Sequence, residues 1–197
     1  MRKPHEMMTD RALLVSLLHV AESFGRAQDR PQGLMSDVKL QQLAFLCELK
    51  FFDERIRGFH FEFFRYAYGA FSKDLDNDLL SLRRKERLDN FSPTERAAEV
   101  LKLVEEAAQA SEPNGRVIEM LHAVTTTYAS QDSDALTKSV EAVTLILPDQ
   151  PTRNLTIREI SFHSTLLVPS RIEVDAAFEL SSAMLARLST ALGYQAA

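Results

Sequence analysis

The stretch Phe64-Arg65-Tyr66-Ala67-Tyr68-Gly69-Ala70-Phe71-Ser72-Lys73-Asp74-Leu75 gathers four aromatic side chains around one glycine and then becomes polar. Glycine adopts positive φ without steric cost, which a tight turn between bulky neighbours requires. A serine hydroxyl at position 72 is placed to cap the first turn of a following helix. The stretch therefore predicts a turn at Gly69 and a helix that begins after Ser72.

The aromatic side chains of this stretch have two interpretations, both of which the sequence leaves open. Rigid, partly exposed aromatic rings are common anchors in protein recognition. Rings of the same kind also fill the interior of helical domains. The four side chains concerned are Phe64, Tyr66, Tyr68 and Phe71.

Length and cysteine content indicate a protein that folds without disulfides or structural metals. A chain of 197 residues is long enough to bury roughly 70% of its unfolded surface in one domain. Its single cysteine, Cys47, lies within an apolar helical pattern. We expect this thiol to behave as a small buried apolar group in a reducing cytoplasm.

The charge balance argues against a protein whose main task is to bind nucleic acid. The net charge is −5, whereas binding to phosphates requires a basic face. The dense basic cluster of the chain is interrupted by Glu86, as in the solvent face of many helices. It comprises Arg83, Arg84, Lys85 and Arg87.

Apolar periodicity predicts a mainly α-helical, compact domain with about six to seven helices. A small β-hairpin is expected in the C-terminal third, where β-branched residues become frequent. The chain divides into a helical domain at residues 1–147 and a segment at 148–197 that contains a linker, the hairpin and a last helix. The expected helices span residues 10–24, 37–57, 73–87, 93–110, 116–128, 134–147 and 174–192.

The N-terminal apolar run is predicted to be an amphipathic helix and not a membrane segment. Glu6 and Asp10 precede the run, His19 interrupts it, and it is too short to cross a bilayer. We therefore expect a soluble, cytoplasmic protein.

Local motifs refine these boundaries. Ser36 is placed to cap the helix over residues 37–57. Ser92-Pro93-Thr94-Glu95 has the pattern of a capping box that starts a helix at Pro93. Residues 112–115 contain proline and glycine and predict a turn between two helices. Alternating phenylalanines at residues 59–63 are compatible with a brief strand. The expected hairpin pairs residues 156–162 with 165–168.

The chain contains no strong signature of an enzyme, and we expect no cofactor, no metal and no catalytic residues. It has no phosphate-binding glycine loop, no paired-cysteine motif and no nucleophile elbow. Arg116 and His122 have the spacing of the arginine–histidine pair in helical ribonucleases of the HEPN type. Other arginines and histidines of this chain fall in the same loose window, so a ribonuclease is only a minor alternative.

Taken in order, Lys39-Leu40-Gln41-Gln42-Leu43, the aromatic stretch and Ser72 resemble two related groups of small bacterial proteins. These are the SocA-like antitoxin domain, also called Panacea, and the YwgA-like proteins. Both carry a Lys-Leu-Gln-Lys-Leu helix followed by aromatics that end in Tyr-Gly-Pro-Phe/Tyr-Ser. The resemblance covers residues 38–88, and Ala70 replaces the usual proline.

The resemblance implies a mostly helical domain that neutralises a toxin by binding it directly. In some members of the family the domain delivers the toxin to a protease. The carried-over motif residues would either contact the partner or hold the fold, and for Lys39 and Gln41 an exposed helical face is the plain alternative. The motif comprises Lys39, Gln41, Phe64, Tyr66, Tyr68, Gly69, Phe71 and Ser72.

We therefore expect a non-catalytic protein-binding module that covers a toxin with its aromatic stretch, helped by the segment after Pro148. A cognate toxin or another protein is the expected partner, and a homodimer is compatible with the sequence. No contact with a membrane or with nucleic acid is expected. The first alternative is a DNA-binding regulator similar to winged-helix proteins, which would use Arg83, Arg84, Lys85 and Arg87.

Overall fold

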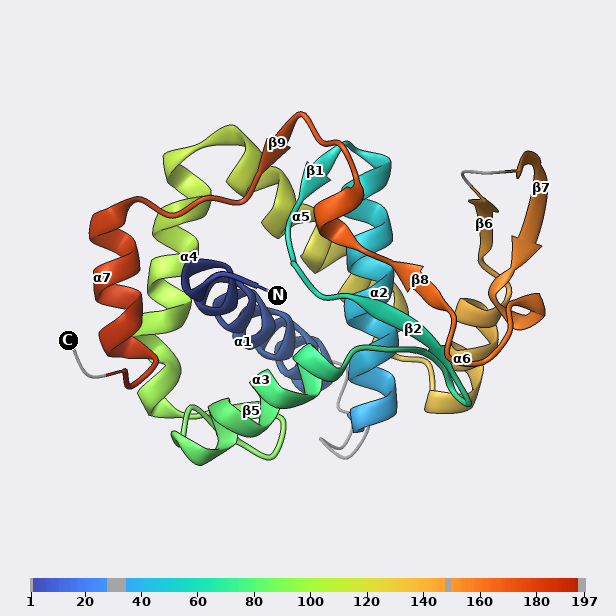
Figure 1. The fold of residues 1–197 in the computed structure, drawn as a ribbon. Helices are drawn as coiled ribbons and strands as arrows, with labels where there is room; N and C mark the ends of the chain where they lie inside the picture. Colours follow the sequence, from blue (N-terminus) through green and yellow to red (C-terminus); the bar gives the residue numbers. More distant parts are fainter. Residues whose placement is uncertain (1, 28–34, 148–149, 195–197) are drawn as a thin grey trace.

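The computed structural model describes residues 2–27, 35–147 and 150–194. This part of the chain is mainly helical and confirms the predicted fold class (Figure 1). The helices are α1 Pro4–Ala27, α2 Asp37–Asp53, α3 Lys73–Arg84, α4 Ala98–Ala110, α5 Glu112–Tyr128, α6 Ser133–Glu141 and α7 Ser182–Ala191.

Helix α1 is the centre of the molecule, with α4, α5 and α3 packed around it (Figure 1). Its apolar run is buried on every side, which is typical of a core helix, so the predicted amphipathic character is wrong for this run. The run consists of Ala12, Leu13, Leu14, Val15, Leu17 and Leu18, all at most 1% exposed. In the described ranges, no helix combines the length and apolar character needed to cross a membrane.

The strands are short and form four small sheets. In the central sheet, β2 pairs on one side with β3 and on the other with β8, both antiparallel. Strands β1 and β9 pair in parallel. Their bounds are β1 Ile56–Arg57, β2 Phe63–Tyr66, β3 Gly69–Phe71, β4 Leu88–Asp89, β5 Ser92–Pro93, β6 Thr144–Leu147, β7 Gln150–Thr156, β8 Thr165–Leu167 and β9 Ala176–Ala177.

The C-terminal part of the chain is tied to the helical body by these pairings. Strands β8 and β9 join β2 and β1, and α7 packs on α4 and α1. The β6–β7 hairpin projects away from the body (Figure 1). A hairpin in the C-terminal third was predicted, and β6–β7 confirms it.

The residues of that hairpin differ from the prediction. Residues 156–162 and 165–168 do not pair with each other; instead, β8 pairs with Phe63 and Phe64 of β2. The predicted helix over 134–147 is also too long, because α6 ends at Glu141 and residues 144–147 form β6. The partner of β8 is remote in the sequence, and local patterns do not reveal it. Strand β6 instead pairs with β7, which follows it directly.

The predicted start positions of two helices, α4 and α5, are wrong. Ser92 and Pro93 form β5, which pairs with β4, so Ser92 does not cap a helix. Helix α4 begins at Ala98, after a 3₁₀ turn over Glu95–Ala97. The expected turn at residues 112–115 is the first turn of α5, because Ser111 caps it and proline is tolerated there.

Three other helices differ from the prediction in length: α1 is longer than predicted, and α2 and α7 are shorter. Helix α1 extends from Pro4 to Ala27 and is longer than the predicted 10–24. Helix α2 starts after its predicted cap, Ser36, but ends at Asp53, where Arg55 takes a φ of 55° and the chain enters β1. Helix α7 is shorter than the predicted 174–192, because residues 176–177 form β9.

The alternating phenylalanines at residues 59–63 connect β1 to β2 and point into the core. The rings of Phe59 and Phe61 stack with centroids 5.1 Å apart, and Phe45 of α2 contacts Phe63 edge-on at 5.1 Å. Only Phe63 belongs to a strand. The alternation therefore reflects an extended segment with one side buried in the core, and most of this segment is not paired as a strand.

Candidate protein-binding surface

Two glutamines of α2 hold the backbone of the aromatic stretch. Gln41 accepts a hydrogen bond from the Ser72 amide at 2.8 Å and donates to the Ser72 carbonyl at 3.0 Å. Gln42 donates to the carbonyls of Tyr68 and Ala70 at 2.8 and 3.0 Å and accepts from the Ala70 amide at 3.2 Å. We call Gln41 and Gln42 the glutamine pair. It satisfies the outer edge of β3 as a neighbouring strand would.

Gly69 adopts the predicted positive φ, at 94°. A Cβ atom at this position would lie 2.5 Å from Oε1 of Gln42. Glycine is therefore required twice, once for the backbone conformation and once for the close approach of the glutamine side chain. The sequence predicted the first reason, and only the structure shows the second.

Lys39 is also a structural residue. Its side chain is buried, and its Nζ donates to the carbonyl oxygen of Ala129 at 2.5 Å, just past the end of α5. A lysine at a helix C-terminus satisfies a free carbonyl and interacts well with the helix dipole. The exposed helical face considered for Lys39 and Gln41 is wrong, since both are at least 95% buried.

Ser72 confirms its predicted role at the start of α3. It is completely buried, and its hydroxyl accepts a hydrogen bond from the Leu75 amide at 3.4 Å. Lys39, Gln41, Gly69 and Ser72 thus form the structural half of the motif. Gln41, Gly69 and Ser72 hold the β2–β3 turn and the start of α3 against α2, whereas Lys39 ties α2 to the end of α5.

The aromatic half of the motif reaches the surface. Tyr66 and Tyr68 are 46% and 62% exposed, while Phe64 and Phe71 are half-buried. The rings of Tyr66 and Phe71 lie with centroids 5.4 Å apart. None of the four rings is fully buried, so the stretch does not simply fill the core, and its role in recognition stays a prediction.

A shallow apolar pocket lies between α2, the β2–β3 turn and α3, and we call it the aromatic groove. Its volume is about 160 Å³. Tyr66, Tyr68 and Phe71 form its aromatic wall. Val38 and the glutamine pair line the side of α2, while Asp37 and Asp76 lie at its edges.

The C-terminal part of the chain adds to the same end of the molecule. His163 contacts the Tyr66 ring edge-on with centroids 5.8 Å apart, and Phe162 lies over the guanidinium of Arg65 at 5.1 Å. Phe162 is 61% exposed. We call Tyr66, Tyr68, Phe71, Phe162 and His163 the aromatic surface.

Behind this surface, Arg65 connects the β2–β3 turn, the segment at Ile157 and helix α6. The sequence analysis missed this residue. Its buried guanidinium donates to the carbonyls of Ile157 and Tyr66 and pairs with Glu141 of α6 at 2.8 Å. The available signal was a single arginine within an aromatic run. A buried arginine requires several acceptors, so such a position predicts close packing from other segments.

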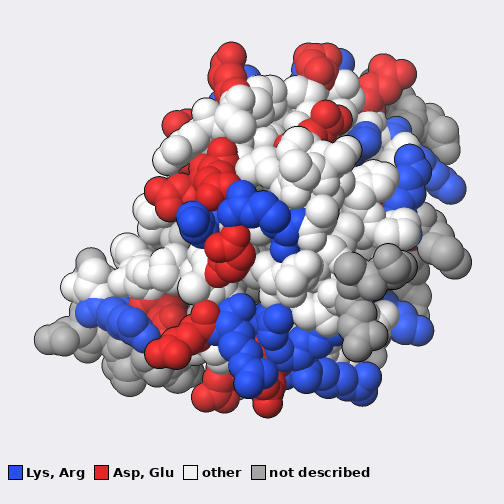
Figure 2. Space-filling model, turned by 90° about the vertical axis from the view of Figure 1, so that its left-hand side faces the viewer, with Lys and Arg blue, Asp and Glu red and all other residues white. Residues whose placement is uncertain are grey.

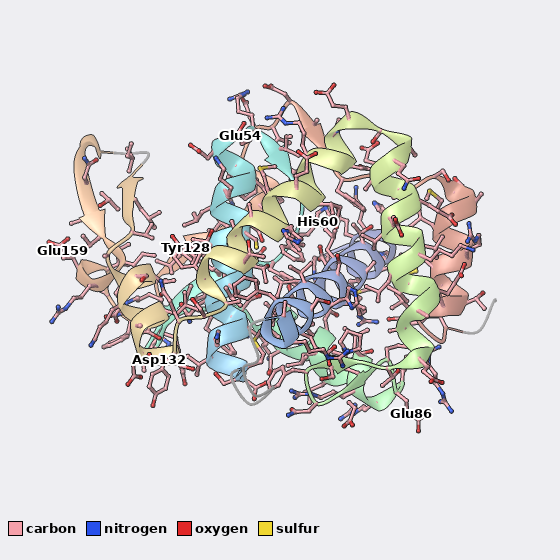
Figure 3. All side chains as sticks on the ribbon, turned by 180° about the vertical axis from the view of Figure 1, so that it is seen from behind. Glu54, His60, Glu86, Tyr128, Asp132 and Glu159 are labelled. Carbon is pink, nitrogen blue, oxygen red and sulfur yellow. The ribbon has the colours of Figure 1, made fainter. Side chains whose placement is uncertain are left out.

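A second cluster of polar residues lies in the interior, around the start of α1. Arg2 pairs with Asp10 and Asp78 at 2.7 and 2.6 Å, and Arg11 pairs with Asp78 at 2.7 Å. His60, labelled in Figure 3, lies beside α1, with its Nδ1 2.9 Å from Asp10. Burial raises the pKa of Asp78, although both arginines act to lower it. These contacts fasten α1 to α3 and to the segment before β2.

Glu48 lies near this cluster and is completely buried. Neither of its carboxyl oxygens has a hydrogen-bond partner among the described residues. Burial, together with the nearby Asp10 carboxylate, raises the pKa of Glu48 well above its usual range. A polar pocket of about 140 Å³ opens beside the cluster between Arg57 and His60. Among the residues that line it, Arg2 pairs with Asp74 at 3.4 Å.

Most of the predicted basic cluster is engaged within the protein. Arg87 and Lys85 donate to the carbonyls of Ala191 and Gly193 at the end of α7, at 2.5 and 2.9 Å. Arg83 donates to the carbonyl of Asn90. On the face that carries α7, basic side chains gather in the lower half but have acidic neighbours (Figure 2). These contacts favour a structural role for the cluster.

Arg116 and His122 are not brought together. Six residues of an α-helix correspond to a rotation of about 240°, so the two side chains leave α5 in different directions. Arg116 pairs with Glu54, just past the end of α2, at 2.6 Å, whereas His122 is exposed. Within residues 2–27, 35–147 and 150–194, no group of three or more histidine, cysteine or acidic side chains is placed to bind a metal ion.

Comparisons of this chain with protein-family models, curated proteins and solved structures found no match.

Proposed function

We propose that this protein is a non-catalytic protein-binding module similar to the toxin-neutralising antitoxins, and that the aromatic surface is where it binds. The observation that supports the proposal is the exposure of Tyr66 and Tyr68 at the aromatic groove and of Phe162 on the C-terminal segment, where the next residue, His163, contacts Tyr66. Across the described part of the chain, five large apolar or aromatic side chains are exposed, and Tyr66, Tyr68 and Phe162 are three of them. Such clustering is typical of interaction sites.

The backbone behind the surface supports the same function. The glutamine pair fixes the β2–β3 turn through five hydrogen bonds to residues 68–72. Side chains on a rigid support lose little conformational entropy when a partner binds, so more of the contact energy appears as affinity. Tyrosines in this setting are frequent hot spots.

The proposed mechanism is occlusion of the partner's active surface. The aromatic surface combines residues from β2–β3 with Phe162 and His163 from the C-terminal part of the chain. A toxin bound there would be covered by the β2–β3 residues and by the C-terminal residues together. Delivery of the bound toxin to a protease is an extension of the same proposal, as in some members of the family that the motif resembles.

Co-expression tests this function. The neighbouring reading frame should arrest growth when expressed alone and should be harmless beside this protein. The Tyr66→Ser/Tyr68→Ser variant should lose the protection, because it removes two of the three rings that form the aromatic wall of the groove. Ile146→Ser is the matched control, since Ile146 is also exposed, at 66%, but lies on the projecting hairpin.

Growth that is unaffected by the neighbouring gene, or full protection by the double variant, would contradict the proposal. Point variants are preferable to deletion of residues 150–194. Such a deletion would remove β8, β9 and α7, which pair with or pack on the body.

A further inference from the structure

We infer that the aromatic groove receives a basic segment of the partner, in which an apolar anchor side chain is flanked by lysine or arginine. This inference rests on the proposed function and specifies the chemistry of the partner. It is carried by the size of the groove, the closed edge of β3 and the two carboxylates at the groove edges.

The size of the groove fits one side chain better than a free ligand. Its volume of about 160 Å³ is smaller than the roughly 300–1,000 Å³ of typical small-molecule pockets. Its wall is built from Tyr66, Tyr68 and Phe71. A leucine or aromatic side chain on the partner would bury apolar area there and displace water from these rings.

The partner cannot extend the sheet at this site. The outward-facing backbone groups of Ala70 and Ser72, and the carbonyl of Tyr68, are already bonded to the glutamine pair. Strand addition requires free amide and carbonyl groups along an edge. Recognition in the groove must therefore occur through side chains.

The charge at the groove edges is acidic. Asp37 is the first residue of α2 and has a side chain that is 65% exposed. Its contact with Arg83 is long, at 3.4 Å, and the guanidinium of Arg83 is also held by the carbonyl of Asn90 at 2.9 Å. Asp76, on α3, has no ion pair among the described residues.

Two carboxylates beside an apolar groove complement cations placed on either side of an apolar anchor. Opposite charges at the rim of an interface accelerate association and exclude partners of the wrong sign. The net charge of −5 acts in the same direction. An acidic partner segment would be repelled here.

A library of displayed 12-residue peptides tests this inference on the immobilised full-length protein. Parallel selections would use the wild type, Tyr68→Ser and the Asp37→Asn/Asp76→Asn variant. The wild type should enrich peptides with lysine or arginine on both sides of an apolar residue. Tyr68→Ser should lose this enrichment, while the asparagine variant should enrich apolar peptides without the basic preference.

A synthetic peptide from the wild-type selection then gives a quantitative result. Its affinity should fall at least about 5-fold in the asparagine variant, and the difference should shrink at high salt. Neutral or acidic peptides that depend on Tyr68 would overturn the inference and leave the proposed function standing. No enrichment, or equal enrichment on Tyr68→Ser, would show that the groove is not a peptide site. The co-expression experiment remains the independent test of function.

Discussion

Asp78→Asn is expected to lower the free energy of unfolding by about 3 kcal/mol, because it removes one partner of a buried charge network. The Asp78 side chain is 1% exposed and accepts from Arg2 at 2.6 Å and from Arg11 at 2.7 Å. Arg2 keeps Asp10 in the variant, but Arg11 loses its carboxylate. Urea unfolding followed by circular dichroism measures the change as a lower midpoint.

Asp76→Asn is the control for this prediction. It makes the same substitution two positions earlier on α3, at a half-buried residue with no ion pair among the described contacts. Its midpoint should stay close to that of the wild type, as expected for a substitution away from the core. Equal, small changes in both variants would show that the network around Arg2 does not hold α1 against α3.

Gly69→Ala should destabilise the protein by about 3 kcal/mol, through two additive causes. An alanine is strained at a φ of 94°. In addition, its Cβ would lie 2.5 Å from Oε1 of Gln42 and would displace that side chain. The carbonyls of Tyr68 and Ala70 would then lose a buried donor. Thermal and urea unfolding measure the loss.

Gly25→Ala is the control for Gly69→Ala and is expected not to destabilise the protein. Gly25 lies in α1, and no atom lies within 4 Å of the position of an added Cβ. Alanine favours a helix over glycine by about 1 kcal/mol, so this variant should be as stable as the wild type or more stable. If Gly69→Ala also leaves stability unchanged, the glutamine pair does not fix the β2–β3 turn.

The local features of the motif could be predicted from the sequence because each depends on neighbouring residues. The turn at Gly69, the cap at Ser72 and the cap at Ser36 follow from backbone chemistry within a few positions. The number of helices follows from apolar periodicity. These predictions agree with the structure.

Features that depend on distant partners could not be predicted in the same way. A lysine on a helix is usually exposed. The Nζ of Lys39 instead donates a hydrogen bond to the carbonyl oxygen of Ala129, which is distant in the sequence. Ser92 fits a capping box, but pairing with β4 removes it from the helix. The partners of β8 and β9 are more than 100 positions away along the chain. Contacts with remote residues decided the outcome for Lys39, β8 and β9, whereas Ser92 pairs with the neighbouring strand β4.

The candidate site shows the same division. The sequence identified Tyr66, Tyr68 and Phe71 but could not separate them from the buried residues of the motif. It also missed Phe162, His163 and Arg65, which reach the site from β2 and from the C-terminal part of the chain. A surface assembled from two segments appears only when the fold brings them together.

Calorimetric titration of the purified product of the neighbouring reading frame tests the central claim most directly. The wild-type protein and Ile146→Ser should bind that product with the same affinity. Tyr66→Ser/Tyr68→Ser should bind at least about 30-fold more weakly, as expected for the loss of hot-spot tyrosines worth about 2 kcal/mol or more. Equal affinity of all three proteins for the product would show that the aromatic surface is not where this molecule binds its partner.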